Sequence, residues 1–210
     1  MLALHKNYFL SVLLLLGSPL ISSEEDPHIF IDKNAQKMVQ VLIENKNLFT
    51  EDRNAYENKI KEIFEPMINF RLVAATVMGK KYYSASSTEQ RKDFVNIFKD
   101  SLLDTYAETL AQWENQAIET IFLDSPELLT SKNSEVKQIL NTGSSKYPIS
   151  YKLRKNKNNE WMIVNIIVNG VNLGLTFRNQ FQALAIKNNG DIELTLKGWV
   201  SDAGDAGING

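Results

Sequence analysis

The sequence predicts an α+β fold, with N-terminal helices first, an antiparallel sheet of about four strands next, and C-terminal helices last. Three observations support this order. Apolar residues recur every three or four positions up to about residue 113, as on the buried face of a helix. From about residue 117 to residue 169 they alternate with polar residues or form short apolar runs, as in strands. After Gly170 the helical spacing returns.

The first two helices are each marked by an apolar stripe and a capping aspartate. Residues 35–43 form the first stripe, and Asp32 precedes it as the expected N-cap. Residues 56–64 form the second stripe, with Asp52 in the equivalent position. The stripes predict two amphipathic helices that bury one side against the rest of the protein.

Two further helices are predicted before the sheet. The third begins near Pro66, and Gly79 together with the polar residues after it is expected to end it. Ser87 followed by Gln90 has the pattern of a capping box, which opens the longest helix. That helix carries its apolar stripe over residues 94–113.

Four segments have the character of strands: residues 118–123, 135–140, 147–154 and 160–169. The polar run 155–159 (KNKNN) predicts a hairpin turn between the last two of them. The strand that starts at Trp161 is apolar on both faces, which is typical of a central strand covered on both sides. A helix is predicted after Gly170, and a short final helix over residues 191–199.

The first 23 residues predict export. Tyr8–Leu16 is almost wholly apolar and follows a basic start, and the small residues Ser22 and Ser23 end the segment. This order is typical of a secretory signal peptide, with cleavage expected after Ser23 or Ser22. A membrane anchor is the alternative, but the apolar stretch is shorter than the roughly 20 residues that a spanning helix needs. We therefore expect a periplasmic protein with residues 1–23 removed.

The remaining chain is predicted to form a single domain over residues 24–200, followed by a disordered tail over residues 201–210 (SDAGDAGING). The chain contains no cysteine, so it forms no disulfide and cannot carry the cysteine-linked lipid of a lipoprotein. The formal net charge of −2 argues against a nucleic-acid partner, because nucleic-acid binding usually requires a basic face.

Histidine usage argues against an enzyme. Of the two histidines, His5 lies in the predicted signal peptide and His28 lies close to the new N-terminus. Ser-His-Asp and Cys-His sites, and the common zinc sites, need a histidine or cysteine held by the fold. A carboxylate base stays open as an alternative, with Glu119, Glu135 and Glu160 near strand ends as the candidates. We predict no catalytic residue, no metal site and no cofactor.

Three stretches together resemble a known family. They are AATVMGKKYYSASSTEQR at residues 74–91, DFVNIFKDSLLDTYAETL at residues 93–110, and VNGVNLGLTFRNQF at residues 168–181. In this order and spacing they resemble the periplasmic phospholipid-binding component of the Mla (maintenance of lipid asymmetry) pathway, the MlaC or toluene-tolerance auxiliary family. The similarity extends over the predicted mature chain to about Trp199.

The resemblance implies a shuttle. Members of this family carry phospholipid between an inner-membrane ABC transporter complex, with its membrane-anchored substrate-binding subunit, and an outer-membrane lipoprotein–porin complex. The lipid is the cargo, its acyl chains lie in an apolar cavity between sheet and helices, and the component itself hydrolyses no ATP. The alternatives that the residues leave open are a periplasmic binding protein for an isoprenoid or quinone, and a structural interaction protein.

The candidate residues for lining the cavity are apolar or aromatic and come from the predicted helices and strands. They are Phe70, Val73, Val77, Phe98, Leu102, Tyr106, Tyr151, Val164, Ile166, Val168, Val171, Leu173 and Phe177. The same side chains could fill an ordinary core, because packed interiors use the same residue types. Arg178 is interpreted first as one half of a surface ion pair, and second as a contact for a lipid phosphate or a partner carboxylate.

Overall fold

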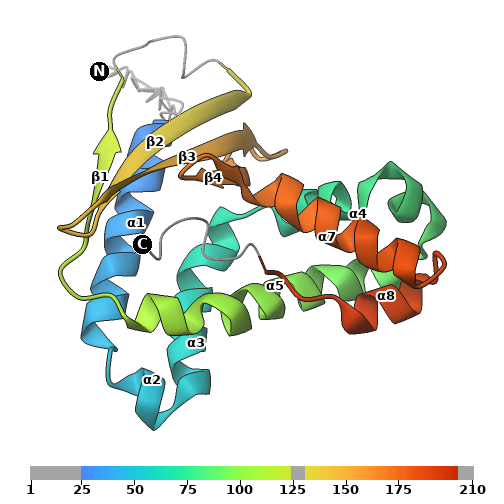
Figure 1. Cartoon of the computed structure of the whole chain (residues 1–210). Coiled ribbons are helices and arrows are strands. Elements are labelled where there is room, and N and C mark those ends of the chain that lie inside the picture. The colour runs from blue at the N-terminus through green and yellow to red at the C-terminus, as the bar shows by residue number, and fades with distance from the viewer. Residues whose placement is uncertain (1–24, 124–130, 203–210) are drawn as a thin grey trace, which may run out of the picture.

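The computed structural model describes residues 25–123 and 131–202, so the predicted signal peptide and most of the predicted tail lie outside the described residues. The helices are α1 (Pro27–Glu44), α2 (Leu48–Glu51), α3 (Arg53–Phe64), the 3-10 helix η1 (Glu65–Met67), α4 (Phe70–Ala85), α5 (Thr88–Ala111), α7 (Leu173–Lys187) and α8 (Ile192–Gly198). Helix α1 packs along the sheet, whereas α4, α7 and α8 extend away from it with the long α5 as a lobe of their own (Figure 1).

The predicted antiparallel sheet is present, with one strand more than expected. Its strands are β1 (Ala117–Ile121), β2 (Asn133–Asn141), β3 (Lys146–Lys155), β4 (Trp161–Val168) and β5 (Val171–Asn172), in the spatial order β1-β2-β3-β4-β5. Every neighbouring pair is antiparallel, so the sheet is a simple meander.

The fifth strand was not predicted, because the helix was expected to follow Gly170 directly. Instead, Asn169 and Gly170 both have positive φ, 48° and 82°, and reverse the chain so that Val171 pairs with Val168. Positive φ at both central residues is characteristic of the two-residue hairpin turn that Asn-Gly favours. The hairpin returns the chain to the edge of β4 before α7 begins.

Side-chain caps fix the starts of the helices. The predicted capping box is confirmed: the Gln90 backbone N–H donates to Ser87 Oγ over 3.1 Å, and the Ser87 N–H donates to Gln90 Oε1 over 2.9 Å. The predicted cap of α3 is also confirmed, with Asp52 Oδ1 accepting from the Ala55 N–H over 3.0 Å.

The predicted cap of the first helix was wrong. Helix α1 begins at Pro27 and is capped by Asp26, which accepts from the His28 N–H over 2.7 Å. Proline is well suited to the first helical position, so the Asp-Pro pair starts the helix earlier than the apolar stripe indicates. Asp32 instead accepts a hydrogen bond from the Thr120 hydroxyl over 2.7 Å, and so ties α1 to β1. Nearby, the Gln36 side chain donates to the Ile118 carbonyl over 3.1 Å.

Helix α4 ends at Ala85, among the polar residues that were expected to close it, but it does not end at Gly79. The chain breaks there, with φ 70° and ψ 163°, and then resumes the helix as far as Ala85. Glycine is essentially the only residue that adopts this conformation without strain. The second part of α4 is held by tertiary packing, because the Tyr82 ring lies 5.9 Å from the Phe181 ring of α7, edge to face.

The core divides into separate clusters. The lobe cluster lies among α4, α5, α7 and α8 and contains Phe70, Val73, Ala74, Val77, Met78, Tyr82, Phe94, Phe98, Phe177, Phe181, Ala185, Ile192, Leu196 and Trp199. The sheet cluster lies between the sheet and α1, α3 and η1, and contains Ile31, Ile63, Met67, Val136, Leu153, Trp161 and Ile163. A third cluster joins α1, α3 and α5 around Tyr56.

A strap of chain packs against both the lobe cluster and the sheet cluster. Ile68, between η1 and α4, packs against both clusters. The adjacent Asn69 N–H donates to the Ile163 carbonyl over 3.0 Å, and Ile68 pairs with Ile163 in a parallel bridge. A seam therefore runs between two separately packed bodies and is crossed by this strap.

We predict that Tyr56→Phe stabilises the protein. Tyr56 is 0 % exposed, and its hydroxyl has no hydrogen-bond partner among the residues that the structure describes. Because an unpaired buried hydroxyl costs about 1–3 kcal/mol, its removal should raise the free energy of unfolding at pH 7 by about 1 kcal/mol, measured by urea denaturation. A loss of stability at neutral pH would show that the hydroxyl is paired.

The Tyr56→Phe variant also tests how the stability of the protein depends on pH. Burial raises the pKa of Tyr56 to about 12, from its ordinary value of 10.0. Ionisation of Tyr56 therefore leaves the free energy of unfolding unchanged below pH 10 and lowers it as the pH rises towards 12, because the unfolded phenol ionises first. The Tyr56→Phe protein should lack this part of the alkaline loss. Parallel denaturation curves of both proteins at pH 8 and pH 11 provide the measurement.

Candidate functional site

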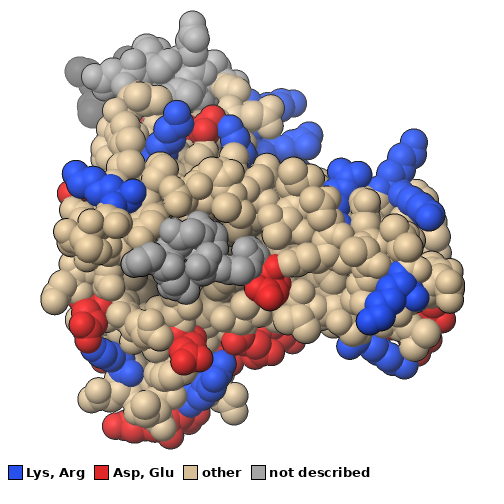
Figure 2. All heavy atoms as spheres, viewed as in Figure 1, with Lys and Arg blue, Asp and Glu red and all other residues tan. Residues whose placement is uncertain are grey.

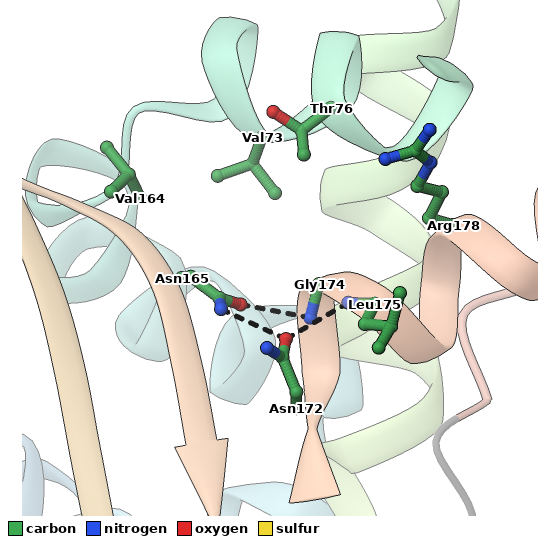
Figure 3. Close-up of a pocket in the computed structure, with 8 residues that line it drawn as sticks. All are labelled: Val73, Thr76, Val164, Asn165, Asn172, Gly174, Leu175 and Arg178. Carbon is green, nitrogen blue, oxygen red and sulfur yellow. Dashed lines mark hydrogen bonds between the residues drawn. The ribbon is translucent and has the colours of Figure 1, made fainter.

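A small pocket opens on the seam, between α4, β4, β5 and the first turns of α7 (Figure 3). Its volume is about 200 Å³. Its walls combine apolar side chains with polar ones: Val73 and Thr76 from α4, Val164 and Asn165 from β4, Asn172 from β5, and Gly174, Leu175 and Arg178 from α7. The site thus draws its residues from both sides of the seam.

Two asparagines hold the start of α7 against β4. Asn165 Nδ2 donates to Asn172 Oδ1 over 3.0 Å, and Asn165 Oδ1 accepts from the Gly174 backbone N–H over 3.0 Å. Asn172 Oδ1 also caps α7 by accepting from the Leu175 N–H over 3.0 Å. These bonds, which we call the Asn165–Asn172 clamp, form one wall of the pocket (Figure 3).

The clamp depends on a glycine. A Cβ placed on Gly174 would stand 2.6 Å from Asn165 Oδ1. Real Cβ atoms do not approach an oxygen so closely, so any larger residue displaces the Asn165 side chain from its present position.

At the other end of the pocket, Arg178 of α7 reaches the break in α4. Its Nε and one Nη lie 3.4 and 3.5 Å from the position that a Cβ on Gly79 would occupy. The absence of a side chain at Gly79 therefore gives the guanidinium its place against α4. The expected surface ion pair is not present within residues 25–123 and 131–202, where no carboxylate pairs with Arg178.

Comparisons with known proteins identify the family. The family model described as "MlaC protein" matches residues 32–200. The chain belongs to the MlaC family. The resemblance found in the sequence is thereby confirmed, and the match includes all the residues that line the pocket.

Two curated relatives match this MlaC-family chain over most of their length. The toluene tolerance protein ttg2D of Pseudomonas putida is 28 % identical over 197 residues, which cover 93 % of this chain and 90 % of the relative. The intermembrane phospholipid transport system binding protein MlaC of Haemophilus influenzae is 25 % identical over 191 residues, which cover 89 % and 79 %.

A solved structure shares the fold. The phospholipid-binding protein from Ralstonia solanacearum, determined in complex with a phospholipid, superposes with a TM-score of 0.74 at 20 % identity. The alignment covers 82 % of this chain and 94 % of that one. The helices, the antiparallel sheet and their connections are therefore those of a known architecture.

Apart from Val164, the predicted lining residues of this MlaC-family chain fall into three groups. Those from the helices belong to the lobe cluster or pack against it: Phe70, Val73, Val77, Phe98, Leu102, Tyr106, Leu173 and Phe177. Tyr151 and Ile166 pack against the sheet cluster on the other side of the seam. Val168 is buried and pairs with Ile149 and the half-buried Val171 at the end of the sheet.

Only two of these predicted residues, Val73 and Val164, line the pocket itself. For the others, contact with a ligand stays a prediction. The residues that prediction missed are mainly polar: Thr76, Asn165, Asn172 and Gly174, with Leu175 beside them. One signal could have found them, because Asn165 interrupts the otherwise apolar strand WMIVNIIV. A polar residue inside an apolar strand requires a partner, and the clamp supplies it.

Two general findings bear on the chemistry of the molecule. Over the described residues, no three or more His, Cys, Asp or Glu side chains are grouped so that they could hold a metal ion. In the same part of the chain, none of the helices combines the length and the apolar character that crossing a membrane requires.

We predict that Gly174→Ala weakens the fold through the clamp. The added methyl group displaces Asn165 and with it two hydrogen bonds, each contributing about 0.5–1.5 kcal/mol, so unfolding should require about 2 kcal/mol less. Gly198→Ala is the matched control, because its Cβ would meet only Leu184 Cδ2, at an ordinary 3.8 Å. Thermal and urea unfolding of both variants give the comparison. Equal stability of Gly174→Ala and wild type would rule out the clamp as described.

Proposed function

We propose that this protein is a periplasmic phospholipid carrier, which moves lipid between membrane complexes of the Mla pathway and helps to maintain the lipid asymmetry of the outer membrane. The proposal rests on membership of the MlaC family and on two relatives whose names record phospholipid transport or binding. The role is one of binding rather than catalysis, and the lipid is cargo rather than a cofactor.

The observation that carries the proposal is the position of the pocket on the seam. The lobe cluster and the sheet cluster are packed separately and share the Ile68 strap as their junction. A ligand that enters between them would therefore loosen contacts across the seam, the Asn165–Asn172 clamp among them, without dismantling either core. An ordinary pocket inside a single core could grow only by breaking packed contacts.

The pocket, as it stands, is too small for the two acyl chains of a phospholipid. At about 200 Å³ it is below the roughly 300–1,000 Å³ of sites for small-molecule ligands. Two acyl chains therefore need the seam to widen. Widening would expose the half-buried side chains beside the seam, Leu102, Tyr106 and Leu173 on the lobe side and Tyr151 and Ile166 on the sheet side, as walls for the chains.

The energetic need for such walls is large. Each CH₂ group of a lipid chain costs about 0.8 kcal/mol in water, so two chains of about 16 carbons would cost on the order of 25 kcal/mol. A soluble carrier replaces water with apolar side chains over most of that length. The apolar and aromatic side chains predicted as lining residues are of the kinds that such a cavity uses.

The partners and the compartment complete the proposal. We expect the signal peptide to be cleaved near Ser22 or Ser23, releasing the carrier into the periplasm. There it would receive or deliver lipid at the inner-membrane ABC transporter complex with its membrane-anchored substrate-binding subunit. The outer-membrane lipoprotein–porin complex would be the other docking partner.

Native mass spectrometry tests the proposal directly. The mature chain, residues 24–210, is purified without detergent from the periplasm of a Gram-negative host. Adducts with the masses of intact two-chain phospholipids would support the carrier role. Isoprenoid or quinone adducts would instead support a carrier of another apolar ligand. A bare protein that also takes up no lipid from phospholipid vesicles would overturn the proposal.

A further inference from the structure

The pocket opens between two helices whose charges are all of one sign. Helices α4 and α7 carry no aspartate or glutamate, and their cationic side chains are Arg71, Lys80, Lys81, Arg178 and Lys187. Strand β4 and the two residues of β5 carry no charge at all. The charged side chains on the helices and strands around the pocket are therefore all cationic, in a chain whose formal net charge is −2.

The contrast with the neighbouring elements is clear. Helix α5 carries more carboxylates than cations, with Glu89, Asp93, Asp100, Asp104 and Glu108 along its length. On the face shown in Figure 2, red side chains gather over α2, α3 and the adjoining part of α5, whereas blue ones predominate on the lobe that contains α4 and α7. On this face the positive side chains thus lie over the pocket end and over the sheet, and the negative ones gather at the opposite end around α2 and α3.

Arg178 is the cation that lines the pocket, and its guanidinium is available. It makes no ion pair or hydrogen bond with the described residues, and it lies exposed against Gly79 at the mouth. The Asn172 Nδ2 amide on the facing wall likewise donates to none of the described residues. Two donor groups therefore border a pocket that the apolar side chains of Val73, Val164 and the exposed Leu175 also line.

This combination matches an anionic amphiphile. The apolar lining suits the part of a lipid next to its glycerol, and the guanidinium fork matches the oxygens of a phosphate ester. We propose that Arg178 recognises the phosphate of the lipid headgroup, so that the pocket mouth selects phosphate-bearing lipids over uncharged lipids with the same acyl chains. The inference rests on the proposed function and adds the group that distinguishes one lipid class from another.

A competition experiment between two lipids tests this preference. Mature wild-type protein is incubated with vesicles that contain equal amounts of phosphatidylglycerol and diacylglycerol with identical chains, then reisolated and analysed by native mass spectrometry. Wild type should take up mainly phosphatidylglycerol. Arg178→Gln should bind lipid but lose about tenfold in this preference, as expected when a charge-assisted hydrogen bond is removed. Lys187→Gln, on the same helix but outside the pocket, should keep the wild-type preference.

The outcomes separate this inference from the proposed function. If wild type and Arg178→Gln both load lipid with the same preference, the headgroup role of Arg178 is overturned and the carrier role stands. If wild type loads neither lipid, the carrier role itself fails, and this inference fails with it. A second arm adds inorganic phosphate in excess. Competition by phosphate as effective as that by phosphatidylglycerol would assign the mouth to free phosphate and overturn the lipid-headgroup assignment.

Discussion

Replacing Val164 with arginine is expected to abolish lipid loading while the protein stays folded. Val164 lies half-buried on β4 and lines the pocket together with Val73. An arginine side chain would occupy much of the available 200 Å³ and bring a second guanidinium close to Arg178. Loss of even two buried CH₂ contacts, about 1.6 kcal/mol, weakens binding more than tenfold, and a blocked pocket removes many more.

The fold should survive this substitution. Val164 is only half-buried, so the long side chain can direct its charge towards the pocket mouth. We expect a loss of about 1–3 kcal/mol from overpacking, against a total stability of about 5–15 kcal/mol. Circular dichroism and thermal unfolding check the fold, and native mass spectrometry with phospholipid vesicles checks loading.

Two controls make the result specific. Val164→Leu keeps this part of the lining apolar and should still load lipid. Ile186→Arg places the same charge on a 69 % exposed position of α7, outside the pocket, and should load like wild type. Full loading of a folded Val164→Arg protein would show that lipid enters elsewhere.

Replacing Phe94 with alanine is expected to cause the largest loss of stability. The Phe94 ring is 0 % exposed and lies 4.9 Å from the Phe181 ring and 5.1 Å from the Trp199 ring, edge to face in both cases. It joins α5 to α7 and to the segment after α8. Truncation of a buried phenylalanine costs about 3–5 kcal/mol, since both burial and a filled volume are lost. In a protein of this size that corresponds to a fall in Tm of about 10 °C.

The matched control is an exposed aromatic residue. Tyr83 is 37 % exposed and lies beneath the Arg91 guanidinium, 4.2 Å from its ring centre. Tyr83→Ala should cost less than about 1 kcal/mol, as is usual for a surface contact. Similar losses for the two variants in urea denaturation would contradict the packing described for the lobe cluster.

Short-range sequence patterns predicted the starts of two helices correctly. The Ser87 capping box and the Asp52 cap were readable because each depends on residues a few positions apart. The start of α1 was placed wrongly because the apolar stripe begins at Ala35, whereas the Asp26–Pro27 pair that starts the helix precedes it. The β5 hairpin was missed although Asn169–Gly170 signalled it, because the apolar residues after the turn also fit a helix.

The site was harder to predict than the fold. Val73 and Phe98 have the same apolar character and helical spacing, yet Val73 borders the pocket and Phe98 is closed within the lobe cluster. Periodicity shows which face of a helix is covered, but not whether protein or ligand covers it. Asn165 was the more informative signal, because a polar residue in an otherwise apolar strand requires a partner.

The edges of the sheet have a consequence for solubility. An open strand edge is a template on which other chains can add, and proteins that expose apolar surface are at risk of aggregating there. At one edge, the two residues of β5 pair with only the last two residues of β4, and the Ile68 bridge and the Asn69 N–H engage Ile163 earlier in that strand. At the other edge, the Gln36 amide occupies the Ile118 carbonyl and Thr120 is bonded to Asp32. These contacts leave less of each strand edge free for another chain to add to.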